Sequence, residues 1–191
     1  MNPIIDISGV TLVTSRLTLR AWRETDLEDF YEYASVEGVG AMAGWAAHTC
    51  LEDTKRVLDQ FIAQRKVFAL EKNEKVIGSL GIETYDELQF PELAELRCRE
   101  LGFVLSKDYW GQGLMPEAVC AVVEYLFSKI HLDAILCGHF LWNSQSARVQ
   151  EKCGFRHYAY NRYKTIMGTV EDNEDCILLW EEWENARKNQ S

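Results

Sequence analysis

The sequence predicts a single α+β domain built around a largely antiparallel sheet. Two amphipathic helical segments come early in the chain, and strands joined by a hairpin follow them. Strands and helices then alternate, and the last predicted segments are strands. The chain has 191 residues and no linker, repeat or low-complexity stretch, so it fits one domain that spans residues 1–191.

The N-terminal segments predict a strand and a first helix. Residues 16–21 alternate apolar and polar side chains, which is typical of a strand. Thr25 and Glu28 then have the spacing of a capping box, in which each side chain caps the other residue's N–H. Apolar side chains recur at helical spacing directly after this box. They are Leu27, Phe30, Tyr31 and Ala34.

A glycine-rich break at residues 38–44 separates this helix from a second one. Thr49 and Glu52 form a second predicted capping box, and the apolar residues after it keep the helical period. The pattern then changes to strands at residues 67–71 and 76–83, which a short polar turn joins as a hairpin.

The remaining segments complete the order β, α, α, β, β, β, α, β, α, β, β. They are a strand at 99–105, a turn at 106–114, a helix with an apolar face over 118–130, a strand at 134–140, a helix at 143–153, and strands near 160–167 and 176–180. Asn143 is the expected N-cap of the fourth helix, and Gly154 is expected to end it.

Composition and charge exclude several classes of function. The formal net charge is -10, which disfavours nucleic-acid binding and suits a cationic partner. The chain lacks an apolar run of about 18 residues, the length that spans a bilayer, and residues 1–10 lack the features of a signal peptide. We therefore expect a cytoplasmic protein without a membrane partner. Cysteines and histidines show no metal-ligand spacing, so no metal is expected.

A glycine-containing turn before the third helix is the most informative segment for function. Gly111 and Gly113 allow the backbone to approach a ligand closely, and the helix is expected to start near Pro116. The N–H groups of residues 111–115 and the positive end of the helix then favour an anion such as a diphosphate. The turn matches neither a Walker loop nor a dinucleotide-binding GxGxxG motif.

Together with a second segment, this turn gives the sequence a resemblance to the GNAT acetyltransferase superfamily, and more narrowly to the branch with the ribosomal-protein alanine acetyltransferases. The matching residues are 15–20, 77–80, 100–103, 110–113, 117–118, Asn143, Ser146, 151–155, 172 and 182–183. The resemblance covers a core of about residues 12–184. It implies a twisted, mostly antiparallel sheet whose middle strands splay apart, flanked by about four helices. It also implies acetyl-CoA as cosubstrate and an amine as acceptor.

The resemblance further implies which residues contact acetyl-CoA. The backbone of the strand before the turn would lie against pantetheine, the turn would hold the diphosphate, and the start of the fourth helix would form the opposite wall. These residues are Phe103, Val104 and Leu105 on the strand, Trp110, Gly111, Gln112, Gly113, Leu114 and Met115 in the turn, and Asn143 and Ser146 on the helix.

The transfer chemistry requires a base, because an amine with a pKa of about 8 to 10.4 is mostly protonated at neutral pH. Glu100 is the first candidate, since it begins the strand that leads into the cofactor turn. Glu83 is the second and His48 the third. A backbone N–H of Val104 or of a neighbouring residue is expected to hold the oxyanion.

The departing thiolate benefits from a proton donor, and many members of the family use a tyrosine in the fourth helix. Gln150 stands at that position here and is unsuited to the role, so Ser146 is the candidate acid, with Tyr158 and Tyr160 as alternatives. No acetyl-enzyme is expected at Cys153, because a helix C-terminus raises a thiol pKa.

Residues 38–48 either border the acceptor or form a lid packed on the core. A non-catalytic acyl-CoA-binding module with the same fold is the alternative function, and a structural interaction protein is a third. The sequence leaves the acceptor open between a protein N-terminus and a small amine, and the assembly open between monomer and homodimer.

Overall fold

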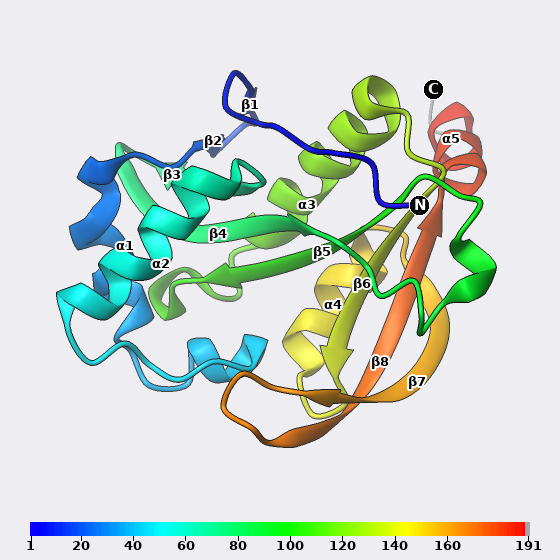
Figure 1. Cartoon of the computed structure of the whole chain (residues 1–191). Coiled ribbons are helices and arrows are strands. Elements are labelled where there is room, and N and C mark those ends of the chain that lie inside the picture. The colour runs from blue at the N-terminus through cyan, green and yellow to red at the C-terminus, as the bar shows by residue number, and fades with distance from the viewer. Residues whose placement is uncertain (190–191) are drawn as a thin grey trace.

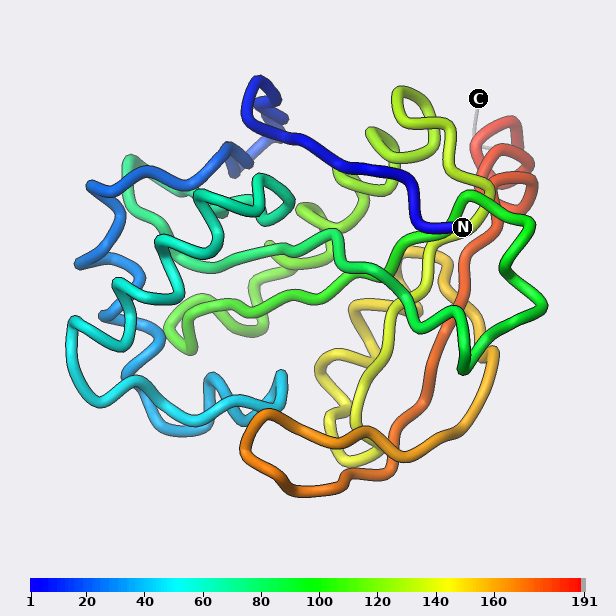
Figure 2. The backbone as a smooth tube through the Cα atoms, viewed as in Figure 1, coloured from blue at the N-terminus to red at the C-terminus, as the bar shows by residue number. Residues whose placement is uncertain are grey.

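The computed structural model describes residues 1–189, in which eight strands form one sheet in the order β1-β2-β3-β4-β5-β6-β8-β7 (Figures 1 and 2). All neighbouring strands are antiparallel except β5 and β6. The strands are β1 (Thr11–Val13), β2 (Thr18–Ala21), β3 (Val67–Lys72), β4 (Lys75–Glu83), β5 (Cys98–Leu105), β6 (Ala134–Phe140), β7 (Arg156–Lys164) and β8 (Val170–Leu179).

The same residues form five α-helices, which cover both faces of the sheet. The helices are α1 (Leu27–Ala34), α2 (Leu51–Gln64), α3 (Leu114–Tyr125), α4 (Ser144–Lys152) and α5 (Trp180–Lys188). A π-helical turn, Leu126–Ile130, continues α3, and a 3₁₀ turn, Gly40–Ala43, lies between α1 and α2. Within the described residues, none of the helices has the length and apolar character needed to cross a membrane.

The predicted fold class is confirmed, and the differences lie mainly at the two ends of the chain. The short strand β1 and the helix α5 were not predicted, so the structure has five α-helices where about four were expected. Strands β7 and β8 begin earlier than expected, at Arg156 and Val170. The first half of β8 is polar, because it pairs with the exposed edge strand β7, and such a segment has little hydrophobic pattern.

Both predicted capping boxes are wrong in detail. Before α1, the carboxylate of Asp26 accepts the N–H of Arg23 at 2.8 Å, and Thr25 has no capping role. Before α2, Thr49 donates its hydroxyl to Asp53 at 2.7 Å, and the N–H of Thr49 donates to the same carboxylate at 3.3 Å. The carboxylate therefore comes one position after the predicted Glu52. In the described chain, neither α1 nor α2 has a side-chain hydrogen bond at its own N-cap residue.

Two apolar cores hold the helices against opposite faces of the sheet. The larger core packs α3 on one face and includes Leu80, Leu101, Val119, Val122 and Ile135. The smaller core packs α1 and α2 on the other face and includes Phe30, Tyr33, Leu58, Val67 and Ala69. Strand residues alternate between these cores, as expected for a sheet that is covered on both sides.

The sheet splits in its middle between β5 and β6. Their parallel pairing runs from Cys98 opposite Ala134 only to Leu101 opposite Cys137, whereas β5 stays paired with β4 as far as Leu105. Figure 1 shows the ends of β5 and β6 pointing away from each other. The last part of β5 therefore has a paired edge toward β4 and an open edge toward the gap.

Candidate functional site

The backbone of β5 directs peptide groups into the gap between β5 and β6. The N–H of Ser106 donates to the carbonyl of Ile77 at 2.7 Å. This bond fixes which residues of β5 direct their N–H and C=O groups toward β4, since every second residue does so in an antiparallel pair. By this alternation the peptide groups of Val104 point toward β4, and those of Phe103 and Leu105 point into the gap. The amides that face the gap are thus those of the neighbours Phe103 and Leu105, whereas the N–H of Val104 faces β4.

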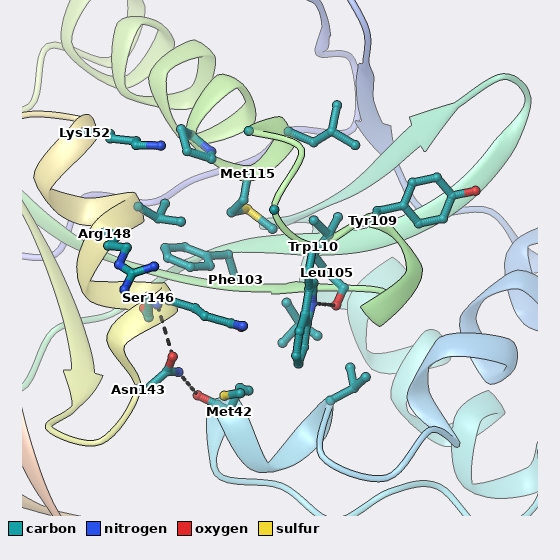
Figure 3. A pocket seen from close by; sticks show the side chains of 18 residues that line it. Met42, Phe103, Leu105, Tyr109, Trp110, Met115, Asn143, Ser146, Arg148 and Lys152 are labelled. Atoms are coloured by element: carbon teal, nitrogen blue, oxygen red, sulfur yellow. Dashed lines mark hydrogen bonds between the residues drawn. The ribbon is translucent and has the colours of Figure 1, made fainter.

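A cavity of about 340 Å³ occupies this gap (Figure 3). Of the residues predicted to contact acetyl-CoA, those that line it are Phe103, Val104, Leu105, Trp110, Gly111, Gly113, Leu114, Met115, Asn143 and Ser146. Figure 3 shows Trp110 and Met115 on one side and Asn143, Ser146 and Arg148 on the other. The predicted Gln112 is not part of the lining, because its side chain turns back and donates to the carbonyl of Asp108 at 3.1 Å.

The turn before α3 borders this cavity at Gly111 and Gly113. Gly111 and Gly113 have φ of 73° and 74°, a region that favours glycine. Helix α3 begins at Leu114, two residues before the predicted Pro116, so Leu114 and Met115 lie in its first turn and their N–H groups have no partner within the helix. In the described part of the chain, no protein acceptor faces the N–H groups of residues 111–113.

An arginine on the outer side holds this turn in place. The guanidinium of Arg16 donates to the carbonyl oxygens of Gln112 at 2.9 Å and Gly113 at 3.2 Å, and to the carboxylate of Glu117 at 2.6 Å. The carbonyls of Gln112 and Gly113 therefore have a protein partner, while the N–H groups of residues 111–113 are left without one among residues 1–189. In the sequence, Arg16 and Glu117 were identified only among the residues that match the GNAT superfamily. Their contact was not predicted, because it joins segments about 100 positions apart.

Glu117 is ionised over the whole ordinary pH range. Burial alone would raise the pKa of this carboxyl, but hydrogen bonds from Thr14, Arg16 and Ser15 outweigh burial and lower the pKa to about 2. The negative charge of Glu117 therefore balances the positive charge of Arg16 beside the turn.

The opposite wall of the cavity is held by the N-cap of α4. Asn143 is buried; its side-chain oxygen accepts the N–H of Ser146 at 3.0 Å, and its side-chain nitrogen donates to the carbonyl of Met42 at 3.1 Å (Figure 3). Gln150, also buried, donates to the carbonyl of Gly138 at 3.0 Å and to the hydroxyl of Ser146 at 3.3 Å. This network fixes the Ser146 hydroxyl at the cavity.

Two cations that the sequence reasoning missed also line the cavity. Arg148 and Lys152 lie one turn apart on α4 and face it from the side opposite the turn (Figure 3). Their spacing of four positions places them on one face of the helix, and this was the available signal. They complement the positive end of α3 in favouring an anionic ligand.

A second, larger cavity of about 930 Å³ meets the first at β5. It lies on the α1 and α2 side of the sheet and shares Phe103 and Val104 with the first cavity. Its carboxylates are Glu83, Asp86, Glu100 and Asp175, and its aromatic side chains are Phe30, Trp45, His48, Phe61, Phe90, Phe103 and Tyr163. Trp45 also packs on the smaller core, so the segment 38–48 both covers the core and borders this cavity.

Glu100 is partly buried and lies opposite Glu83 in the β4–β5 register. Burial first, and then the negative charges of Asp175, Glu83 and Asp86, raise the pKa of Glu100 to about 7. Asp175, which the sequence reasoning missed, is itself buried; it accepts a hydrogen bond from Asn173 at 3.0 Å, and burial raises its pKa. The cavity thus holds a carboxyl group that changes charge near neutral pH.

The other candidate bases, Glu83 and His48, line the same cavity but have partners of their own, and the alternative acids lie outside both cavities. The carboxylate of Glu83 pairs with Lys66, and a ring nitrogen of His48 lies 2.9 Å from the Thr54 hydroxyl. Tyr158 donates its hydroxyl to Glu92, and Tyr160 is 67% exposed on the edge strand β7. In the region that the structure describes, no three His, Cys, Asp or Glu side chains are grouped as metal ligands would be.

Comparisons with known proteins agree with this geometry. A family model described as an acetyltransferase (GNAT) domain matches residues 16–156. The chain is 30% identical to the uncharacterized N-acetyltransferase YoaA of Bacillus subtilis (strain 168), over 76% of this chain and 82% of that one. It is 24% identical to the ribosomal protein uS5 alanine N-acetyltransferase of Escherichia coli (strain K12), over 95% and 97%. This match confirms the predicted resemblance.

A solved structure shows the same fold. The spermidine N-acetyltransferase of Vibrio cholerae, in complex with CoA and spermine, matches with a TM-score of 0.72 and 18% identity over 90% of this chain and 100% of that chain. At this low sequence identity the match shows a shared fold and nothing more.

Proposed function

Because the chain belongs to the GNAT acetyltransferase family and is an acetyl-CoA-dependent N-acetyltransferase, we propose that it acetylates a primary amine bound in the acidic cavity, by direct attack while both substrates are bound. The observation that carries this proposal is the meeting of the two cavities at Phe103 and Val104. An acetyl group at that place is accessible from the acceptor side, so no acetyl-enzyme is needed.

The residues of the smaller cavity fit acetyl-CoA. The N–H groups of residues 111–115 and the side chains of Arg148 and Lys152 suit its diphosphate. The open edge of β5 at Phe103 and Leu105 suits the amides of pantetheine, since amides pair along a strand edge. When bound, acetyl-CoA supplies an activated acyl group as a thioester.

Glu100 is the proposed base. An amine with a pKa of about 8 to 10.4 enters the cavity as an ammonium ion and has to lose a proton before it attacks. A carboxylate whose pKa is about 7 accepts that proton more readily than an ordinary glutamate does. The N–H of Phe103 faces the gap and donates to the acyl oxygen, and the hydroxyl of Ser146 donates a proton to the departing sulfur.

The lining of the larger cavity supports a cationic acceptor that also has an apolar part. Four carboxylates outnumber the two cations of this lining, Arg162 and Lys164, and aromatic side chains cover the α1 and α2 side. Both a protein N-terminus and a small amine fit this description. Among similar proteins, one is an alanine N-acetyltransferase of a ribosomal protein and another a spermidine N-acetyltransferase.

A titration and a turnover assay test the proposal together. Acetyl-CoA is titrated calorimetrically, and release of the free CoA thiol is followed with a panel of peptide and small-molecule amines. We expect binding, and thiol release that depends on the amine. A non-catalytic acyl-CoA-binding module would show the binding and no thiol release with any amine, which would contradict the proposal.

Ser146→Ala is expected to lower turnover and leave the Kd for acetyl-CoA nearly unchanged, because the hydroxyl acts on the departing sulfur. Ser144→Ala is the matched control, since Ser144 is exposed in the same helical turn and lies outside the lining. Equal turnover of the Ser146→Ala and Ser144→Ala variants would remove Ser146 from the mechanism.

A further inference from the structure

Two cysteines from different helices lie side by side next to the smaller cavity. The sulfur atoms of Cys120 on α3 and Cys153 at the end of α4 are 3.6 Å apart. Cys120 is exposed, and Cys153 is partly buried. The sulfur of Cys153 also lies 3.5 Å from the carbonyl oxygen of Pro116, a residue of the cavity lining. The pair therefore connects the two helices that form opposite walls of the cavity.

Cys120 has the properties of a reactive thiol. The neighbouring thiol of Cys153 lowers the pKa of Cys120, which favours its thiolate, and the side chain is accessible. By contrast, Cys137 and Cys176 of the larger core are buried, and burial raises their pKa. Cys153 is also kept neutral, by its hydrogen bond with Cys120 and by burial, so it suits the role of a second thiol that resolves an oxidised Cys120.

We propose that Cys120 and Cys153 form a reversible disulfide when hydrogen peroxide oxidises the protein, and that this disulfide weakens binding in the adjacent cavity. The Cys120 thiolate attacks one peroxide oxygen; an S–O bond forms, the O–O bond breaks and hydroxide leaves. The Cys153 sulfur then displaces the hydroxyl group from Cys120, an S–S bond forms, and water leaves with the Cys153 proton. The thiols lose two electrons in total, and the peroxide gains two.

The bond changes the geometry of the cavity. A disulfide has an S–S length of about 2.05 Å, whereas the sulfur atoms are now 3.6 Å apart. Closing this distance draws the end of α4 toward α3. Lys152 precedes Cys153 directly, and Pro116 contacts it, and both line the cavity. The opening between the walls therefore narrows, and the affinity for acetyl-CoA falls; this consequence rests on the proposed function.

The test compares oxidised and reduced protein. The full chain is treated with hydrogen peroxide, its peptides are mapped without reduction, and acetyl-CoA is titrated before treatment, after it, and after addition of a dithiol reductant. We expect a peptide linked through Cys120 and Cys153, a several-fold rise in the Kd for acetyl-CoA, and recovery on reduction.

Two single variants complete the design. Cys120→Ser is expected to lose both the linked peptide and the change in Kd, whereas Cys50→Ser, which removes a partly exposed thiol elsewhere, keeps both. Absence of the linked peptide, or an unchanged Kd in protein that carries it, overturns the inference. If the reduced protein does not bind acetyl-CoA, the proposed function fails instead, and the peptide map still decides whether the disulfide forms.

Discussion

Glu100→Gln is expected to lower turnover by roughly two to four orders of magnitude, the usual contribution of a general base. The amide has the shape of the carboxyl group but accepts no proton. In the wild-type protein, kcat/KM should rise with pH through about 7, because Glu100 becomes a carboxylate there. The variant should lack this acidic limb, which a pH series of initial rates measures.

The same substitution is expected to raise the melting temperature at about pH 8, one unit above the raised pKa. The pKa of Glu100 is about 7 in the folded protein, whereas a glutamate in the unfolded chain has a pKa of about 4.3. The folded state thus holds the proton more tightly, and this group lowers the free energy of unfolding as pH rises between these values. The glutamine amide stays neutral, so the variant does not lose this free energy of unfolding as pH rises.

Glu95→Gln serves as the control, because Glu95 is exposed and outside the larger cavity. It should change neither the rate nor the melting temperature. If Glu100→Gln retained the wild-type rate and its acidic limb, the base would be another group, and the assignment to Glu100 would be wrong.

Gly113→Ala is expected to weaken acetyl-CoA binding by about tenfold or more, which corresponds to ~1.4 kcal/mol. Gly113 has a φ of 74°, and a left-handed conformation costs about 1–2 kcal/mol for a residue with a Cβ. The new methyl group meets only the Arg16 guanidinium, at 3.7 Å, so backbone strain and not a clash is the cause. Relief of the strain turns the N–H groups of residues 111–115 away from the cavity.

Gly168→Ala is a matched control for this strain. Gly168 has a φ of 84° in the turn between β7 and β8, and a Cβ there meets nothing within 4 Å. Both variants should lose similar stability in denaturant unfolding, but only Gly113→Ala should lose affinity in calorimetry. Equal affinities of the two variants would show that the turn does not hold the cofactor.

Local pattern predicted the fold class, and the resemblance to the GNAT family implied most of the residues that line the cavity. The apolar period located the main helices, and the glycines at 111 and 113 located the turn. Helix α5 has no such pattern, since its first turn carries Glu181 and Glu182 and its apolar contact is largely Trp183 against Phe127.

The features that sequence reasoning missed depend on strand register or on distant contacts. The choice between Val104 and Phe103 needs the alternation set by Ser106 and Ile77. The raised pKa of Glu100 depends partly on Asp175, which only the pairing of β6 with β8 brings close. The Cys120–Cys153 contact likewise depends on how α3 and α4 pack.

Amide NMR spectra of isotope-labelled protein during an acetyl-CoA titration test the central claim most directly. We predict that the amide signals of residues 111–115 shift most, together with those of Phe103 and Leu105, and that the amide signals of the β7–β8 turn do not shift. Shifts confined to other regions, with the amides before α3 unmoved at saturation, would contradict it.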